Sequence, residues 1–208
     1  MIKIRASELA TFDYCEYLLY LQSEKGDFYF NKQPEYLFKG IEAHKLLDEK
    51  FLRQTTRKMS MRKLLVSKGR IRTRPDASGI MLQAKLGDIN LIGKMDEIVS
   101  DITGVYVIDD KPHYQPYKGY QNQVRTYCFL LQENFKKELG HKQLFSMLRN
   151  TQTQEVFWRE AFSEEVKEEL IKTLTHISNI KRAEIQPRKA VNKAKCYSCR
   201  YAVSCKGV

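Results

Sequence analysis

Cysteines near both ends of the chain constrain how it can fold. Cys15 lies close to the N-terminus, and Cys196, Cys199 and Cys205 lie in a C-x2-C-x5-C arrangement close to the C-terminus. In a reducing compartment, clustered cysteines indicate a metal or redox centre before they indicate disulfides. If the four thiolates bind one centre, the first helix and the last residues must lie together in the fold.

Two kinds of centre are compatible with four thiolates, namely zinc and an iron–sulfur cluster. Structural zinc sites usually pair two short C-x2-C knuckles, whereas Cys15 lies 181 positions before the first of the other three. This spacing favours an iron–sulfur cluster that joins residues 1–30 to residues 184–208. Cys128 stands apart in an apolar stretch and is predicted to be a small core residue.

The charge of the chain indicates a polyanionic partner. The net charge is +11, and residues 53–74 contain nine Lys and Arg residues and no acid. An excess of this kind is typical of nucleic-acid binding. Within this run we predict contacts to a DNA backbone from Arg57, Arg62, Lys63, Arg70 and Arg72.

The sequence shows neither a membrane span nor a secretion signal. No apolar run approaches the roughly 18–20 residues that a membrane helix needs. The first residues lack the apolar core of a signal peptide. We therefore expect no membrane partner and a cytoplasmic location, which would be the host cytoplasm for a viral protein.

The pattern of apolar residues predicts one α/β domain over residues 1–208. A helix of about 15 residues should begin after Ser7 and end near Gly26. A second helix is predicted over 34–51, strands within 80–100 and at 105–111, a helix over 117–134, strands over 142–149 and 155–161, and a helix over 163–183. This order favours a mixed central sheet flanked by helices.

An acidic pair and a lysine are predicted to meet on neighbouring strands. Alternate strand residues point to the same side, so Asp109 and Lys111 share a face and Asp110 points away. A turn at 101–104 can bring Asp96, on the preceding strand, beside Asp109. Two carboxylates held close repel each other unless a cation lies between them, and oxygen ligands of this kind suit Mg²⁺ or Mn²⁺. Lys111 could then orient a water molecule or stabilise developing charge.

The order of the motifs resembles that of a known superfamily. The motifs are Gly40-x-x-x-His44 on a helix, Gly93-x-x-Asp96, Asp109-x-Lys111, and Gln123-x-x-x-Tyr127 on the next helix. This order resembles that of the RecB-like PD-(D/E)xK nucleases, which have a restriction-endonuclease-like core. Together with one early cysteine and the C-x2-C-x5-C tail, the chain resembles the CRISPR-associated Cas-four nucleases over nearly its whole length.

The resemblance implies a role for each of these positions. His44, Asp96 and Asp109 would be the metal ligands, with the main-chain carbonyl of Asp110 as a further ligand, and Lys111 would be the catalytic lysine. Gln123 and Tyr127 would shape the site and position DNA. The four cysteines would hold a [4Fe-4S] cluster. The family more often has Glu at the position of Asp109 and an apolar residue at that of Asp110.

The resemblance also implies an activity. It is that of a Mg²⁺- or Mn²⁺-dependent nuclease acting mainly on single-stranded DNA, as a 5′-to-3′ exonuclease that can also cut internally. In the family this serves CRISPR spacer acquisition beside the integrase complex. The alternatives are a viral replication or recombination nuclease, a non-catalytic iron–sulfur DNA-binding subunit, and a zinc protein. The sequence leaves open the polarity of cleavage, the choice of DNA or RNA, and whether the chain forms a homo-oligomer.

Overall fold

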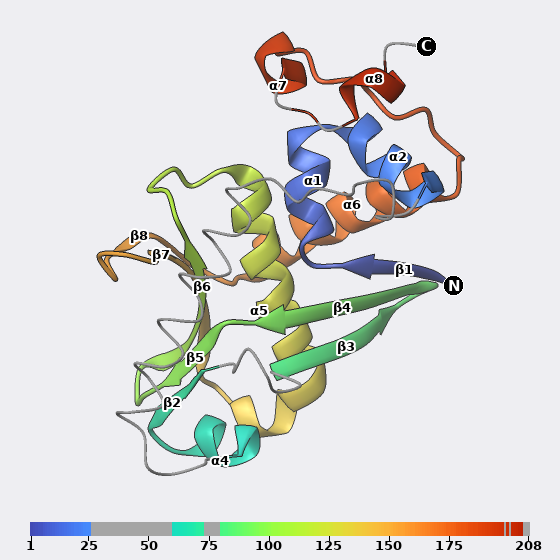
Figure 1. The fold of residues 1–208 in the computed structure, drawn as a ribbon. Helices are drawn as coiled ribbons and strands as arrows, with labels where there is room; N and C mark the ends of the chain where they lie inside the picture. Colours follow the sequence, from blue (N-terminus) through green and yellow to red (C-terminus); the bar gives the residue numbers. More distant parts are fainter. Residues whose placement is uncertain (26–59, 73–79, 198, 200, 206–208) are drawn as a thin grey trace.

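The computed structural model describes residues 1–25, 60–72, 80–197, 199 and 201–205 (Figure 1). In chain order the elements are β1 (Ile2–Arg5), α1 (Glu8–Tyr14), α2 (Glu16–Lys25), α4 (Met61–Val66), β2 (Gly69–Arg72), β3 (Ile80–Leu86), β4 (Ile89–Met95), β5 (Glu97–Ser100), β6 (Gly104–Lys111), α5 (Lys118–Leu139), β7 (Gln143–Asn150), β8 (Val156–Ala161), α6 (Glu164–Lys181), α7 (Lys193–Tyr197) and α8 (Ala202–Cys205). No helix within these ranges is both long and apolar enough to cross a membrane.

The strands form two mixed sheets. One has the order β1-β4-β3 and the other has the order β2-β5-β6-β7-β8. Each contains one parallel pair, β1 with β4 and β6 with β7, beside antiparallel pairs. The predicted class, an α/β fold with mixed sheets flanked by helices, is confirmed. The strands are divided between two sheets, however, where one central sheet was expected.

Asp96 is the joint between the two sheets. It is the single residue between β4, in the three-stranded sheet, and β5, in the five-stranded sheet. Figure 1 shows the chain passing from one sheet into the other at this point. The side chain at this joint can therefore face a space bordered by strands of both sheets.

Helix α5 forms the centre of the core. Every residue from 122 to 131 is buried, so this part of the helix is covered on all sides. It packs against β3 and β4 of one sheet and against β6 and β7 of the other. A helix buried on every face is expected to be apolar or internally satisfied. Its polar residues are accordingly bonded: Thr126 donates to the carbonyl of Asn122, and Cys128 lies 3.2 Å from the Ser146 hydroxyl. The prediction that Cys128 is a small core residue is confirmed.

The predicted first helix is broken into two. Cys15 has extended backbone angles, φ −168° and ψ 120°, and separates α1 from α2. Helical periodicity could not reveal this break because the apolar positions on both sides remain compatible with one helix. The prediction of one continuous helix was wrong. The predicted helix over 34–51, which contains His44, lies outside the described residues.

The later boundaries follow local signals in the sequence. The turn before β6 forms as predicted, with the Asp101 carboxylate accepting from the backbone N–H groups of Thr103 and Gly104. Strand β6 ends at Lys111, immediately before Pro112, which cannot donate to a strand ladder. Ser163 caps α6 by accepting from Val166 N–H.

Candidate active site

The two predicted acids face one cavity. Asp96 Oδ2 accepts a 2.9 Å hydrogen bond from the Asp110 backbone N–H, which fixes the joint between the sheets against β6. Asp109, near the end of β6, is 2% exposed. Both acids line a cavity of about 820 Å³, together with Lys111, Gln123 and Tyr127. Asp110 borders the cavity as well, so the structure brings six of the predicted site residues to one place.

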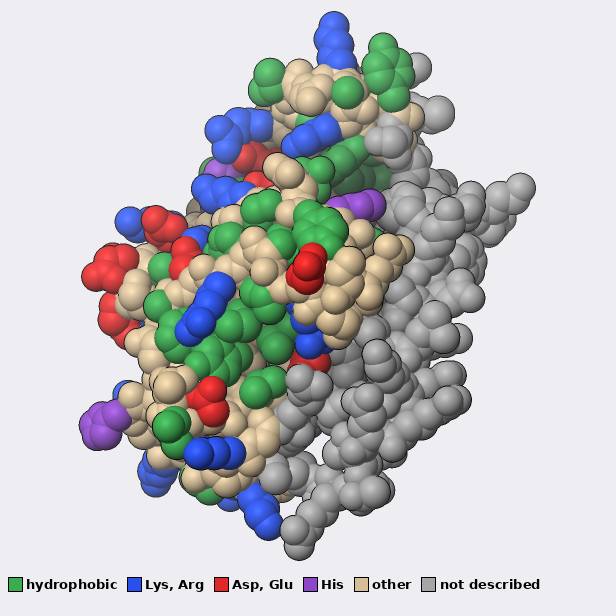
Figure 2. Space-filling model, turned by 90° about the vertical axis from the view of Figure 1, so that its left-hand side faces the viewer, with side chains coloured by type: hydrophobic (Ala, Val, Ile, Leu, Met, Phe, Trp, Pro, Cys, Tyr) green, Lys and Arg blue, Asp and Glu red, His purple; other side chains and the backbone are tan. Residues whose placement is uncertain are grey.

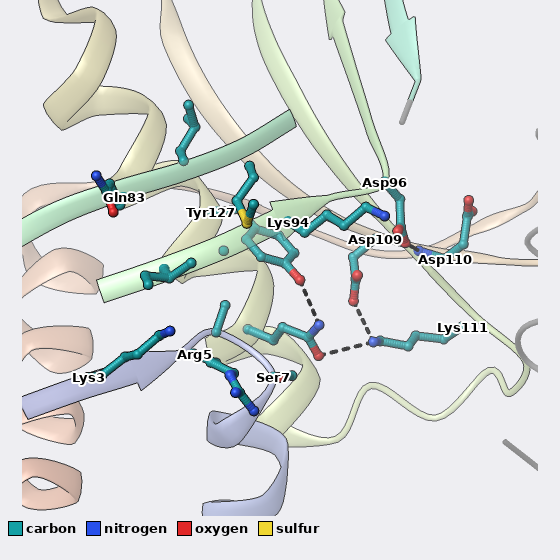
Figure 3. Close-up of a pocket in the computed structure, with 16 residues that line it drawn as sticks. Lys3, Arg5, Ser7, Gln83, Lys94, Asp96, Asp109, Asp110, Lys111 and Tyr127 are labelled. Carbon is teal, nitrogen blue, oxygen red and sulfur yellow. Dashed lines mark hydrogen bonds and ion pairs between the residues drawn. The ribbon is translucent and has the colours of Figure 1, made fainter. Parts of the chain in front are cut away.

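A chain of polar contacts holds the lysine (Figure 3). Lys111 Nζ lies 2.7 Å from Asp109 Oδ2 and donates a 3.1 Å hydrogen bond to Gln123 Oε1. Gln123 Nε2 donates in turn to the Tyr127 hydroxyl at 2.8 Å. Gln123 and Tyr127 lie one helical turn apart on α5, so the helix sets the position of the ammonium group.

Burial and charge give Asp109 an unusual acidity. Burial raises the pKa of this carboxyl to about 7; Lys111 opposes the rise, and the neighbouring charge of Asp96 adds to it. For Lys111, burial alone would lower the pKa, but the Asp109 carboxylate outweighs it and the pKa is raised. The lysine is therefore a cation at neutral pH, and Asp109 would be stabilised as an anion by a further positive charge.

Asp110 points to the other side of β6, as the strand period predicts. Its carboxylate accepts from Arg149 Nε at 2.7 Å and from Arg149 Nη2 at 3.0 Å. Arg149 Nη2 also donates to Glu97 Oε2 at 2.7 Å. The three side chains form a buried ion cluster behind the cavity. Asp110 can therefore offer the cavity only its main chain.

The residues present suit a hard divalent cation. The Asp109 carboxylate is buried and paired with the Lys111 ammonium at 2.7 Å, but its pKa stays raised, so this one cation does not fully offset the cost of burying the anion. A buried carboxylate oxygen in this state would gain from a metal ion. Among the described residues, no group of three or more His, Cys, Asp and Glu side chains is placed to hold a metal. The predicted third ligand, His44, lies outside those residues and stays a prediction.

Gly93 allows α5 to approach β4 beside the cavity. A Cβ atom at this position would lie 2.7 Å from Leu130 Cδ1 and 2.8 Å from Tyr127 Cδ1, closer than ordinary contacts. We expect Gly93→Ala to lower the free energy of unfolding by about 1–3 kcal/mol and to reduce activity by displacing Tyr127. Denaturant unfolding and activity should be measured together.

Gly87→Ala is the matched control for this substitution. Gly87 has a φ of +57° and nothing within 4 Å of an added Cβ, so its cost comes from the backbone alone. This variant should lose stability and keep its activity per folded molecule. Full stability and activity in Gly93→Ala would contradict the close packing of α5 on β4.

The four cysteines line a second pocket. Cys15 lies at the break between α1 and α2, and Cys196, Cys199 and Cys205 lie in or between α7 and α8. All four border a pocket of about 450 Å³. Burial raises the pKa of Cys199, and the other three cysteines add smaller increases, which reflects their proximity.

Polar contacts hold the C-terminal segment against the first two helices. Arg188 donates to the Glu16 carboxylate through its backbone N–H at 3.0 Å and through Nε at 2.9 Å. Its carbonyl accepts from Tyr17 N–H at 3.1 Å, and Lys195 Nζ donates to the Tyr14 carbonyl at 3.1 Å. These bonds join the segment that carries Cys196, Cys199 and Cys205 to the helices on either side of Cys15.

The predicted DNA-backbone residues lie elsewhere or outside the description. Arg62 and Lys63 are exposed on α4, and Arg62 Nε lies 3.2 Å from Glu138 Oε1 at the far end of α5. Glu138 is 15 residues from Gln123, which corresponds to about 22 Å along a helix. Arg57 is outside the described residues, and Arg70 and Arg72 are described only as backbone in β2. Their contacts to DNA stay predictions.

Sequence reasoning missed several residues around the cavity. Lys3, Arg5 and Lys94 line it, and Glu97 and Arg149 support it from behind. The position of Lys94, two residues before Asp96 on a strand, was a usable signal. The places of Lys3, Arg5 and Arg149 depend on strand pairings that the sequence did not specify.

Comparisons with known proteins bear on the family and the fold of the chain. Residues 30–206 match the family described as the PD-(D/E)XK nuclease superfamily. A crystal structure titled "Putative exonuclease", from Eubacterium rectale, is similar with a TM-score of 0.52 and 12% identity, over 95% of this chain and 88% of that one. The structure of SSO0001 is similar with a TM-score of 0.51 and 12% identity, over 98% and 85%. At this identity the two structures support the fold alone. No curated protein matches the chain.

Proposed function

Because the chain belongs to the PD-(D/E)XK nuclease superfamily, we propose that it is a metal-dependent deoxyribonuclease of the iron–sulfur Cas-four type that acts mainly on single-stranded DNA. The observation that carries the proposal is the convergence of Asp96, Asp109 and Lys111 on one cavity, with Gln123 and Tyr127 behind the lysine. Their types and their order in the chain are those that the resemblance to RecB-like nucleases implies for a cleavage site.

The proposed roles follow from the contacts. Asp96 and Asp109 would hold Mg²⁺ or Mn²⁺, with His44 and the carbonyl of Asp110 as the remaining predicted protein ligands. The bound ion would polarise the scissile phosphate and acidify a bound water. Lys111, held as a cation by Asp109 and Gln123, would orient that water or stabilise charge that develops on the phosphate. Tyr127 would keep Gln123 in place.

A pair of tyrosines beside the lysine, one partly buried and one exposed, supports a preference for unpaired DNA. Lys111 Nζ lies 4.5 Å from the centre of the Tyr120 ring. The Tyr117 ring packs edge-on against Tyr120, with 5.5 Å between centroids, and Tyr117 is 53% exposed. Aromatic rings stack on unpaired bases with little regard to sequence. A base next to the scissile phosphate could therefore rest on Tyr117.

Digestion of end-labelled DNA tests the activity. Anaerobically purified protein with Mn²⁺ should degrade single strands faster than duplexes, and labels at the two ends give the polarity, expected to be 5′-to-3′. Lys111→Ala should lose cleavage and keep DNA binding. Binding without cleavage by the unaltered protein would favour the non-catalytic iron–sulfur subunit instead.

The cysteine pocket supports the proposed [4Fe-4S] cluster. Four thiols from both ends of the chain border it, and the tyrosine and leucine side chains of α1 and α2 that share it would shield a cluster from water. Anaerobically purified protein should be brown and contain iron and sulfide, and Cys199→Ser should lose both. Cys128→Ser is the control and should keep the colour. A colourless protein with one bound zinc would support the zinc alternative.

The cellular role that we propose is trimming of DNA before its capture as CRISPR spacers, beside the integrase complex. A viral replication or recombination nuclease would have the same chemistry. Association with an integrase, tested with purified components, separates the two roles.

A further inference from the structure

The three-stranded sheet carries a basic outer face. Strands β1, β3 and β4 contain no Asp or Glu. Their cationic residues are Lys3, Arg5, Lys85 and Lys94, and all four are exposed. A sheet face with one sign of charge and no compensating acid in its strands attracts a polyanion.

The strand register places these four side chains on one face. Lys3 and Lys85 are both paired with Asn90, and Arg5 is paired with Ile92. Paired residues of neighbouring strands point to the same side, and alternate residues of one strand do too. Lys94 therefore shares this face with Asn90 and Ile92. The opposite face contains the buried Ile4 and Leu91.

The cations form a row that begins at the catalytic joint. Lys94 lies two residues before Asp96 on β4. Arg5 is paired with Ile92, two positions before Lys94, and Lys3 is paired with Asn90, a further two positions before. Two residues of strand span about 6.6 Å. This step is comparable with the distance between successive phosphates in an extended nucleic-acid strand. We call Lys3, Arg5 and Lys94 the basic row.

The basic row borders the cavity of the candidate active site. All three of its side chains line the same space of about 820 Å³ as Asp96 and Asp109. In Figure 3, Lys3 and Arg5 lie on β1, and the side chain of Lys94 runs along β4 in the direction of Asp96. On the face seen in Figure 2, by contrast, Lys and Arg side chains are scattered among acidic and hydrophobic ones.

We propose that the basic row binds consecutive non-scissile phosphates of the substrate strand, all on one side of the bond that is cut. The inference rests on the proposed function, because the scissile phosphate is placed at Asp96 and Asp109. It gives the substrate a path over the outer face of β1 and β4. Arg62 and Lys63 lie at the opposite end of α5 and would contact DNA only far from the cleaved bond.

Salt-dependent binding tests the row without any cleavage. The affinity for a single-stranded oligonucleotide is measured in EDTA at several salt concentrations, with Lys3→Gln/Lys94→Gln against Lys136→Gln/Lys137→Gln. The control pair is exposed at the far end of α5 and carries the same charge. Each lost phosphate contact on a single strand lowers the slope of log K against log salt by about 0.7, so we expect a fall of about 1.4 for the first pair. The control should keep the slope.

Backbone substitution locates the contacts. Oligonucleotides with one neutral methylphosphonate linkage are cleaved with Mn²⁺, and the linkage is moved along the strand. Unaltered protein should be slowed by substitution at two or three linkages on one side of the cut, and Lys94→Gln should become insensitive at one of them. The proposal is refuted if the two double variants have equal salt slopes. It is also refuted if methylphosphonate linkages slow cleavage equally on both sides of the cut.

The two proposals fail in different ways. If the unaltered protein cuts DNA but Lys3→Gln/Lys94→Gln keeps the original salt slope, the nuclease function stands and the role of the basic row is refuted. If the double variant shows the expected fall in slope but the unaltered protein cuts no DNA, the role of the basic row in binding stands and the nuclease function is refuted. Thermal unfolding of the variants confirms that both pairs remain folded.

Discussion

Replacing Asp109 with Asn should reduce the rate of DNA cleavage by about 10²–10³-fold or more, the scale on which single electrostatic contacts act in enzymes. The substitution keeps the size of the side chain and removes its charge. In the folded protein the carboxylate is buried, 2.7 Å from Lys111 Nζ, and lines the same cavity as Asp96. Its loss would remove a predicted metal ligand and the partner that keeps the lysine in position. Glu168→Gln, on the exposed face of α6, is the control and should leave the rate unchanged.

The pH dependence of stability separates lost chemistry from lost folding. Burial raises the pKa of Asp109 to about 7 from an ordinary value of 3.8. Between these values the folded protein holds a proton that the unfolded chain releases, so this group makes the metal-free protein less stable as pH rises from about 4 to about 7. Asp109→Asn should remove that part of the decline, and in EDTA at pH 8 it should be at least as stable as the unaltered protein.

Urea unfolding at several pH values in EDTA makes this measurement. Added Mn²⁺ should raise the stability of the unaltered protein at pH 8 and have little effect on Asp109→Asn, because a ligand stabilises only a state that binds it. If the Asp109→Asn variant cleaves DNA at the original rate, or if Mn²⁺ stabilises it as strongly as the original chain, the role of Asp109 as a metal ligand is refuted.

The hairpin of the candidate site could be predicted because its signals are local. A turn sequence at 101–104 and a period of two were enough to place Asp109 and Lys111 on one face and Asp110 on the other. The observed contacts agree, with Lys111 beside Asp109 and Arg149 beside Asp110. The helical spacing of Gln123 and Tyr127 likewise predicted that they share one face of a helix, where the structure shows a hydrogen bond between them.

The division into two sheets could not be predicted because it depends on distant pairings. Strand β1 pairs with β4, nearly ninety positions later in the chain, and β6 pairs with β7 on the other side of α5. The sequence of one strand, four residues in β1 and eight in β6, does not indicate which distant strand it pairs with. The break at Cys15 has no strong local signal either, since no proline or glycine lies beside it. The resemblance to a family supplied the site residues, but it did not supply the basic row.

The buried ion cluster behind the site gives the largest expected effect on stability. Arg149→Met would remove the guanidinium group that pairs with the carboxylates of Asp110 and Glu97, whose side chains are 0% and 1% exposed. Breaking a buried ion pair in this way costs about 3–5 kcal/mol. We expect a loss of this size in the free energy of unfolding, measured in urea.

Arg125→Met is the matched control for this prediction, because Arg125 is equally buried but its partners are not. Glu160 and Glu169, which pair with Arg125, have side chains that are 28% and 66% exposed, so water can solvate them after the change. The loss of stability there should be clearly smaller.

The triple variant Glu97→Gln/Asp110→Asn/Arg149→Met tests the cause of the loss. If the cost in Arg149→Met comes from the two buried carboxylates that lose the Arg149 guanidinium, neutralising both should recover most of the stability. Equal losses in Arg149→Met and in the triple variant would instead assign the cost to lost packing. Cleavage by the triple variant then shows whether the cluster also positions the site. Asp110 donates its backbone N–H to Asp96, so release of its side chain from β7 should loosen that contact and weaken Mn²⁺ binding even where the fold is restored.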